Sequence, residues 1–424
     1  MAIYKGDTKV AGGNFKLDGF ISDTSSNPVP NYVIANALLD VGYSTWQKPA
    51  DWIDIRSGAA DNSAYFLVAH STPTESGGTY TVATYSTFAL SAEVTTAANS
   101  YDVYVDGLKV ATTASAATTT IDWGALYTAG TISSGYNVTT PSAMVSHIIR
   151  VTPAVSTDNI TVLRTQVSAD CGLLWAHLEL TNRIDIRNFT STHCKILQAV
   201  TAKDDEIKVT GTLTNAFYGA SSLEWIAKIV GNNESFSFYQ AFYNASKLKR
   251  LRLKDIWNTT GGGPFYQMSA LEKIETENAY ISLLTTGNTF TGARSLKSVP
   301  PLKGSTAGSS VYISFSNLAS LEPTVLDMSI YPNTTRLLLF GSSTYFSSGL
   351  KGVTVSSSGG FTGSSPQINV SYTGLDRAAL VNLFNSLPTV TGSQVCNITG
   401  ATGADDLTAS DLAIATGKGW TVTR

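Results

Sequence analysis

The chain has 424 residues, with 28 lysines and arginines against 31 aspartates and glutamates, for a net charge of −3 at pH 7. This length suggests two or three domains. Charged residues make up only 14% of the chain and aromatic residues 10%. Wholesale disorder is excluded by this balance, because disordered chains are charge-rich and aromatic-poor. Without a basic excess, we expect no binding to nucleic acid or to an anionic membrane.

The sequence shows no signal for export, membrane insertion or disulfide formation. Residues 1–7 lack the apolar core of a signal peptide, and no run of about 18 apolar residues predicts a membrane helix. We therefore expect synthesis in the cytoplasm. The three cysteines, Cys171, Cys194 and Cys396, are too few and too widely spaced for a disulfide framework. They are interpreted as buried thiols.

The first part of the chain divides into an arm and a β domain. Residues 1–43 show no periodicity, and we interpret them as an N-terminal arm that is either disordered or ordered by docking onto a partner. Residues 44–156 read as a β-sandwich built of short strands. Its strongest signal is Asp106-Gly107, which lies between alternating strands over 101–110 and predicts a hairpin, because both residues tolerate positive φ. A further strand is expected at residues 121–123.

From about residue 171 the sequence repeats with a nearly constant period. A Phe precedes a Leu by six positions five times, and the Leu-to-Leu steps are 25, 23, 25 and 25 residues. These pairs are Phe217/Leu223, Phe242/Leu248, Phe265/Leu271, Phe290/Leu296 and Phe315/Leu321. A second aliphatic follows most of these leucines by three positions, and in the fifth unit we assign it to Val325. Such a period predicts a solenoid over residues 157–370, in which each unit buries its core against its neighbours.

Residues 371–424 have the features of a small α/β cap. Thr373 and Asp376 have capping-box spacing ahead of a helical pattern that Pro388 ends, and Thr408 and Asp411 repeat that spacing before a second helix. A last strand is expected from Trp420. The predicted fold class is therefore mainly β: a β-sandwich, then a leucine-rich repeat solenoid, then this cap, which would cover the last exposed core of the solenoid.

The repeats resemble the BspA type of leucine-rich repeat, with its recurring AF-x-x-C/A-x-x-L unit. Ala216-Phe217-Tyr-Gly-Ala-Ser-Ser-Leu223 and Ala241-Phe242-Tyr-Asn-Ala-Ser-Lys-Leu248 match it closely, although Pro and Thr replace the Ala before Phe265 and Phe290. Shorter matches resemble a bacteriophage-encoded subset of such proteins: Ile3-Tyr4-Lys5-Gly6-Asp7-Thr8-Lys9, Trp46-Gln-Lys-Pro-Ala-Asp-Trp-Ile53, 101–107 and Gly417-Lys-Gly-Trp-Thr-Val422. This resemblance implies a protein attached to a virion whose repeats touch a cell surface.

Catalytic and metal-binding patterns were weighed against simpler interpretations. Glu275 and Glu277 share one face of a predicted strand, which permits a glycosidase-like carboxylate pair but is more typical of a solvated face. His177 and His193 would lie in adjacent repeats near Cys171 and Cys194, but they lack the short paired spacings of a zinc site. We predict no catalytic residues, no metal and no cofactor.

The densest basic cluster of this charge-poor chain is the candidate binding site. It comprises Lys249, Arg250, Arg252 and Lys254, followed by Trp257, with Trp225 interpreted as its counterpart one unit earlier. Cations beside aromatic rings suit an anionic polysaccharide or an acidic receptor. The alternative is that these charges keep a repeat soluble and that the tryptophans fill the core.

The leading hypothesis is a non-enzymatic bacteriophage fibre or adhesin located on the virion. Its N-terminal arm would attach to other virion proteins, and its repeats would contact a host-surface glycan or protein. A homo-oligomer, such as a trimer, would supply avidity. Three alternatives stay open: a structural head fibre or decoration protein, a glycan depolymerase, and a bacterial surface adhesin, which the missing export signal disfavours.

Overall fold

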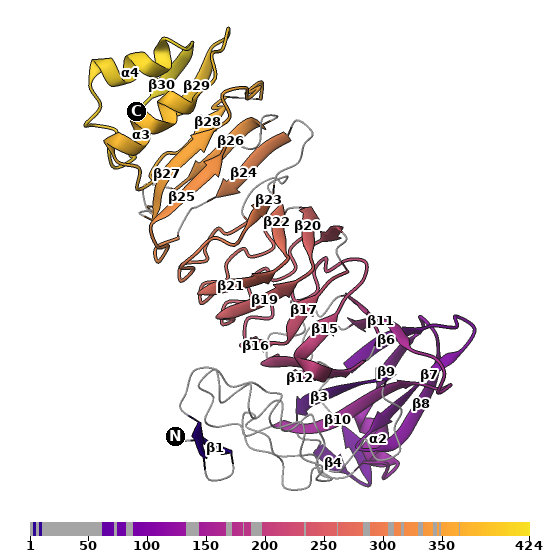
Figure 1. Ribbon diagram of the computed structural model, residues 1–424. Coiled ribbons are helices and arrows are strands. Elements are labelled where there is room, and N and C mark those ends of the chain that lie inside the picture. Colours follow the sequence, from indigo (N-terminus) through magenta and orange to yellow (C-terminus); the bar gives the residue numbers. More distant parts are fainter. Residues whose placement is uncertain are drawn as a thin grey trace. The chain divides into compact units, whose positions relative to one another are not determined.

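The structure is a computed structural model (Figure 1). It describes residues 3–5, 8–10 and 62–424, apart from residues 72–73, 82–87, 133–143, 167–171, 181, 188–196, 233–234, 261, 283–288, 304–308, 315–317, 330–333, 342–345, 347–348 and 364. The protein is mainly β, with 42% strand and 10% helix, and it contains a repeat-type β-solenoid of about 9 turns. Two compact units are present: unit 1 comprises residues 1–209 and 221–229, and unit 2 comprises residues 210–220 and 230–424. The predicted arm falls almost entirely outside the described residues.

Unit 1 is organised around a sheet of seven strands in the order β16-β14-β12-β3-β10-β7-β8. β10 pairs antiparallel with β3 and β7, and β14 pairs parallel with β12 and β16. The sheet therefore changes from antiparallel pairing to the parallel pairing typical of repeats. Its strands are β3 (Ser63–Ser71), β7 (Ser100–Val105), β8 (Leu108–Ala114), β10 (Met144–Pro153), β12 (Leu173–Glu179), β14 (Ala199–Ala202) and β16 (Trp225–Ile226).

A second sheet of unit 1 has four strands in the order β13-β11-β6-β9. Phe66 of β3 and Phe88 of β6 are both buried, with ring centroids 5.7 Å apart, so aromatic side chains of the two sheets meet. The strands are β6 (Phe88–Val94), β9 (Thr118–Ile121), β11 (Ile160–Gln166) and β13 (Asp185–Arg187). Shorter strands are β1 (Ile3–Lys5), β2 (Thr8–Val10), β4 (Thr74–Ser76), β5 (Thr79–Thr81) and β15 (Glu206–Lys208), which follows the 3₁₀ turn η3 (Lys203–Asp205).

The hairpin predicted at Asp106-Gly107 is confirmed. β7 and β8 pair antiparallel around these two residues, whose φ angles are 49° and 86°, as a turn between twisted strands requires. The strand expected at 121–123 is wrong in part. β9 ends at Ile121, and Asp122 caps helix α2 (Trp123–Thr128) by accepting a hydrogen bond from the N–H of Ala125.

Unit 2 consists largely of parallel strands (Figure 1). One sheet has the order β18-β20-β22-β23, another the order β24-β26-β28-β29-β30, and β25 pairs with β27. β19 (Arg250–Lys254) pairs parallel and in register with β21 (Lys273–Glu277). The remaining strands are β17 (Lys228–Val230), most of which belongs to unit 1, β18 (Ser235–Ser237), β20 (Trp257–Thr260), β22 (Tyr280–Ser282), β23 (Leu302–Lys303), β24 (Ser309–Ser314), β25 (Thr324–Met328), β26 (Thr334–Phe340), β27 (Leu350–Val355), β28 (Ile368–Asn369), β29 (Gln394–Asn397) and β30 (Trp420–Thr423).

The repeated phenylalanines form a buried stack along unit 2. The ring centroids of Phe217, Phe242, Phe265 and Phe290 follow one another at 5.2, 6.5 and 5.6 Å, and all four side chains are fully buried. The sequence period is therefore the period of a stacked core, as predicted; Phe315 lies outside the described residues. The assignment of Val325 to the core is wrong, because its side chain is 68% exposed while Leu326 and Met328 are buried.

Residues 371–424 contain two helices, α3 (Arg377–Ser386) and α4 (Ala409–Thr416). The capping box of Thr408 and Asp411 is confirmed at α4. The one predicted from Thr373 is wrong, because Asp376 itself is the N-cap of α3, while the Thr373 hydroxyl donates to the carbonyl of Val370. α3 ends before Pro388, as the sequence indicates.

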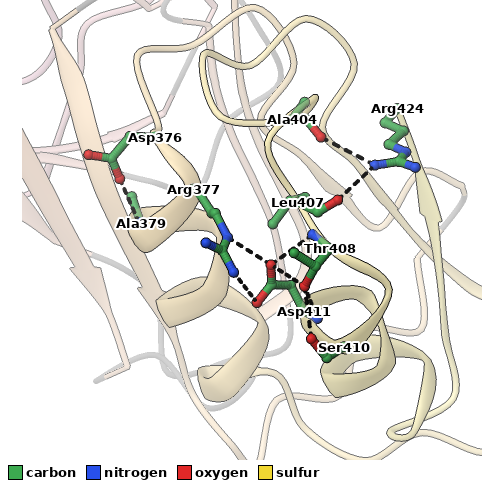
Figure 2. A network of polar contacts seen from close by, with 9 residues as sticks. All are labelled: Asp376, Arg377, Ala379, Ala404, Leu407, Thr408, Ser410, Asp411 and Arg424. Carbon is green, nitrogen blue, oxygen red and sulfur yellow. Dashed lines mark hydrogen bonds and ion pairs between the residues drawn. The ribbon is translucent and has the colours of Figure 1, made fainter.

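The two helices are joined by an ion pair. Arg377 Nε, in the first turn of α3, lies 2.9 Å from Asp411 Oδ2 of α4 (Figure 2). The same carboxylate accepts the backbone N–H of Thr408 at 2.8 Å, so one side chain completes the capping box and links the helices. At the other end of α3, Lys418 Nζ donates to the carbonyls of Asn385 and Leu387, where a cation is favourable.

Candidate functional site

The predicted basic cluster lies mainly on β19. Arg250, Arg252 and Lys254 alternate with the buried Leu251 and Leu253, so the three cations share the outward face of the strand. The register with β21 places Arg252 beside Glu275 and Lys254 beside Glu277. The acidic pair and the basic cluster that the sequence analysis considered separately are therefore neighbours on one surface, here called the charged strand face.

Ion pairs tie the two strands of the charged strand face together. Arg250 Nη2 lies 2.7 Å from Glu275 Oε1, and Lys273 Nζ lies 3.3 Å from the same oxygen. Lys254 Nζ lies 2.6 Å from Glu277 Oε1. The same pattern continues beside the strands, where Lys297 Nζ lies 3.0 Å from Glu272 Oε2. Arg250 and Lys254 are thus matched by carboxylates of the next repeat, and these pairs make the surface less basic than the sequence of the cluster suggests.

The environment of Glu275 bears on the carboxylate-pair hypothesis. Partial burial raises its pKa, but the hydrogen bonds and charges of Arg250 and Lys273 outweigh that effect and lower the pKa below its usual value. A carboxylate with a lowered pKa is ionised at neutral pH, whereas the general acid of a glycosidase needs a raised pKa. Glu275 and Glu277 do share a strand face, as predicted, and the contacts of both are those of a structural ion-pair network.

The other predicted site residues are distributed over different elements. Lys249 is exposed directly before β19, and its carbonyl accepts the N–H of Glu272 at 2.8 Å. Trp257 begins β20, in the sheet β18-β20-β22-β23, and its ring meets that of Tyr280 edge-on at 6.4 Å. Trp225 begins β16, in the seven-stranded sheet of unit 1. The two tryptophans thus belong to different sheets and are not equivalent positions of the repeat.

A row of three tyrosines, which the sequence analysis did not select, runs along unit 2. The rings of Tyr218 and Tyr243 stack with centroids 4.6 Å apart and planes 15° apart, and those of Tyr243 and Tyr266 stack at 4.7 Å and 22°. Each tyrosine follows a core phenylalanine of the repeat and is half-buried. The recurring Phe-Tyr dipeptide is the sequence signal that could have identified them. We call this set the tyrosine row.

The residues that directly follow the three tyrosines lie in tight turns. Asn244 and Gln267 come directly after Tyr243 and Tyr266, are exposed, and have positive φ angles of 62° and 61°. The equivalent position after Tyr218 is Gly219, with φ 71°. The N–H groups of Gly219 and Asn244 donate to the carbonyls of Tyr243 and Tyr266, so each turn is hydrogen-bonded to the next one. This ladder fixes the spacing of the tyrosines and of the amide side chains.

Unit 1 contains a buried polar network around His147. His147 Nδ1 lies 2.6 Å from Asp106 Oδ2 and His147 Nε2 lies 2.7 Å from Tyr127 Oη, while the imidazole is fully buried. Burial, with a smaller contribution from the Asp106 charge, raises the pKa of Tyr127 well above its usual value. The network ties the β7–β8 turn to β10 and α2. Because the imidazole of His147 is out of contact with solvent, we assign the network a structural role, which is to hold these elements together.

The groups considered for zinc do not form a site among the described residues. His177 is buried, with Nδ1 2.9 Å from Thr201 Oγ1 and Nε2 2.9 Å from Glu179 Oε2. His193, Cys171 and Cys194 lie outside the described residues. Within the described ranges, no three His, Cys, Asp or Glu side chains gather as metal ligands would. Cys396 is a buried free thiol, and burial raises its pKa to about 12.

No protein-family model, no curated protein and no solved structure matches this chain. Over the described residues, no helix has the length and apolar character needed to cross a membrane. The candidate sites are therefore defined by their own geometry: the charged strand face and the tyrosine row.

Proposed function

We propose that the chain is a non-enzymatic attachment protein of the bacteriophage fibre or adhesin type, whose β-solenoid contacts the surface of a host cell. The observation that carries the proposal is the tyrosine row. Half-buried aromatic residues at a fixed spacing, flanked by exposed amides, form a surface suited to recognition, since tyrosine gives a large, rigid contact area at a low entropic cost.

The remaining parts of the chain receive matching roles in this proposal. The two sheets of unit 1 are inferred to form a β-sandwich, which the contact between Phe66 and Phe88 supports. Residues 371–424 are inferred to cap the solenoid. The N-terminal arm, residues 1–43, would bind other virion proteins, and a homo-oligomer such as a trimer would multiply weak contacts into avidity. The resemblance of residues 3–9, 46–53, 101–107 and 417–422 to phage-encoded leucine-rich repeat proteins supports a location on the virion.

Antibody labelling of phage particles tests this proposal. Particles from a lysate in which the chain is produced are purified, labelled with antibody against the full chain, and viewed by electron microscopy. We expect label at the tail tip or baseplate, and saturable binding of the purified full chain to host cells. Label on the head together with absent cell binding would replace this function with that of a head fibre or decoration protein. Unlabelled particles would overturn the assignment to the virion.

A parallel incubation separates attachment from glycan cleavage. The purified chain is kept with host capsule or cell-wall polysaccharide, and the size distribution of the polymer is followed by gel filtration. An attachment protein leaves the distribution unchanged. A progressive fall in polymer size would make the chain a depolymerase, and a Glu275→Gln variant would then show whether the carboxylates of β21 take part.

A further inference from the structure

We infer that the tyrosine row binds an uncharged glycan chain that runs along the solenoid, and that the charged strand face does not form this binding surface. The inference rests on the proposed attachment function and names both the ligand class and the residues that bind it. Three features of unit 2 support it: the absence of charged residues from the segments that contain the row, the hydrogen-bonding capacity of its side chains, and their fixed repeat.

The first feature is the separation of charge between two parts of each repeat. Residues 211–220, 236–246 and 257–270, which contain the turns of the tyrosine row, include no Lys, Arg, Asp or Glu. The charges that follow the second and third of these segments lie mainly on β19, on β21 and directly before these strands, where several of them pair with one another. An anionic polymer would find no cation within these three segments; exposed Lys247 comes only after the second one, in the stretch that leads into β19. An uncharged, hydroxyl-rich polymer suits them, because no charged side chain has to lose its hydration when the polymer binds.

The second feature is the hydrogen-bonding capacity of the row. Partial burial, followed by the neighbouring phenols of Tyr266 and Tyr218, raises the pKa of Tyr243 above its usual value. The phenol therefore stays protonated through the physiological range and is able both to donate and to accept hydrogen bonds. The exposed amides of Asn244 and Gln267 add further donors and acceptors directly beside it. A sugar presents many hydroxyls, and such mixed donor–acceptor groups match them.

The third feature is the geometry of presentation. The ring of Tyr243 stacks on Tyr218 at 4.6 Å and on Tyr266 at 4.7 Å, so both of its faces have a stacked neighbour and its side chain is held in one orientation before any ligand binds. Tyr239, in the turn that precedes Tyr243, is 44% exposed and lies against Gly262, where a Cβ atom would come within 2.3 Å of its ring. A row of fixed, repeated contacts favours a polymer over a single sugar, because each repeat adds one more weak contact.

The test uses the full chain and an array of immobilised oligosaccharides. The neutral probes are glucan, galactan and N-acetylglucosamine oligomers, and the anionic probes are uronic-acid-containing and sulfated oligomers, each measured at about 50 mM and about 500 mM NaCl. We expect binding to neutral probes with little change between the two salt concentrations, since salt screens charge–charge attraction and leaves neutral contacts almost unaffected. The neutral probe that binds best is then titrated by calorimetry.

Matched variants locate the binding surface. Tyr243→Phe keeps the ring stack and removes one hydroxyl, so we expect about fivefold weaker binding. Tyr243→Ala also removes the ring, and a loss of about 30-fold is expected. Lys249→Ala, on the charged part of the same repeat, should leave the affinity within about twofold. Circular dichroism of each variant verifies the fold. If Tyr243→Ala misfolds, the test is decided by Tyr243→Phe.

Two results would overturn the inference. Binding confined to anionic probes, weakened by salt and by Lys249→Ala, would move the ligand to the basic cluster formed by Lys249 and β19. An array without any bound neutral probe, for a chain that still binds host cells, would reject the glycan and leave the attachment function intact. Conversely, binding of neutral glycan by a chain that binds no host cell would reject the attachment function and leave the tyrosine row as a glycan site.

Discussion

The guanidinium of Arg250 on β19 donates a hydrogen bond of 2.7 Å to the carboxylate of Glu275 on β21, 25 residues further along the chain. The contact joins equivalent segments of successive repeats, and it explains how a chain with only 14% charged residues carries a dense basic cluster without a strongly basic surface. In the same way, Lys254 of the cluster pairs with Glu277, which is also a carboxylate of the following repeat.

Removing the charge of Glu275 should make this surface basic. We expect Glu275→Gln to elute later than the unmodified chain from a heparin column at low salt, because Arg250 and Lys273 lose their shared counter-charge. The loss of folding free energy should be about 0.5 kcal/mol or less, since Arg250 is largely exposed. Glu322→Gln, an exposed position on a later repeat, gives the same net charge change as a control. Equal retention of the two variants would contradict the pairing.

The phenylalanine stack should carry much of the stability of unit 2. Phe242 is fully buried between Phe217 and Phe265, so Phe242→Ala leaves a cavity and should cost about 3–5 kcal/mol. Urea denaturation followed by circular dichroism measures the loss. Tyr243→Phe, the next residue in the same turn, is the control and should change the free energy of unfolding by less than about 1 kcal/mol. A Phe242→Ala variant as stable as this control would show that the stack adds little.

Gly262 is needed for two reasons, its backbone conformation and the space beside it. Its φ angle is 122°, and an added Cβ would come within 2.3 Å of the Tyr239 ring. We expect Gly262→Ala to destabilise the fold by about 1–3 kcal/mol. Gly360→Ala serves as the control, because an added Cβ there would have no atom within 4 Å and its φ lies outside the left-handed region. Thermal denaturation of both variants compares them, and equal melting temperatures would refute the expected clash.

Thr408 should contribute about 1 kcal/mol to the stability of the C-terminal segment. Its side chain accepts the N–H of Asp411, and its own N–H donates to the Asp411 carboxylate, so Thr408→Ala removes half of the capping box. Thr408→Ser keeps the hydroxyl and should retain the stability. Hydrogen exchange of the α4 amides, residues 409–416, is the measurement. Unchanged protection in the Ala variant would mean that other contacts fix the start of the helix.

The stability of the same segment should depend on acid. The hydrogen bond from Arg377, together with those from Thr408, lowers the pKa of Asp411 from 3.8 to about 2. Because the folded pKa lies below the unfolded one, this stabilisation is fully present above about pH 4 and is lost as pH falls towards about 2. Asp411→Asn should remove this part of the pH dependence, whereas Asp405→Asn, at an exposed position, should keep it. Hydrogen exchange of α4 between about pH 5 and about pH 2 distinguishes the two.

The sequence alone was sufficient for features that depend on local chemistry or on a fixed period. Asp106-Gly107 predicted the hairpin because only a few residues tolerate its φ angles, and Thr408 with Asp411 predicted a helix start through contacts three residues apart. The spacing of Phe217, Phe242, Phe265 and Phe290 predicted a stacked core because burial of large apolar side chains must repeat with the structure. The assignment of Val325 to the core was wrong because successive side chains of a strand point to opposite faces, so a shift of one residue moves a side chain from the core to the surface.

The tertiary structure decided which distant residues meet. Arg250 and Glu275, or Tyr218 and Tyr243, are 25 residues apart, and only the register of successive turns brings each pair into contact. The same register places Trp225 and Trp257 in different sheets, although they look alike in the sequence. The period of a sequence states which positions are equivalent, but contact between side chains depends on strand pairing and turn geometry, which are set by the packing of the whole solenoid.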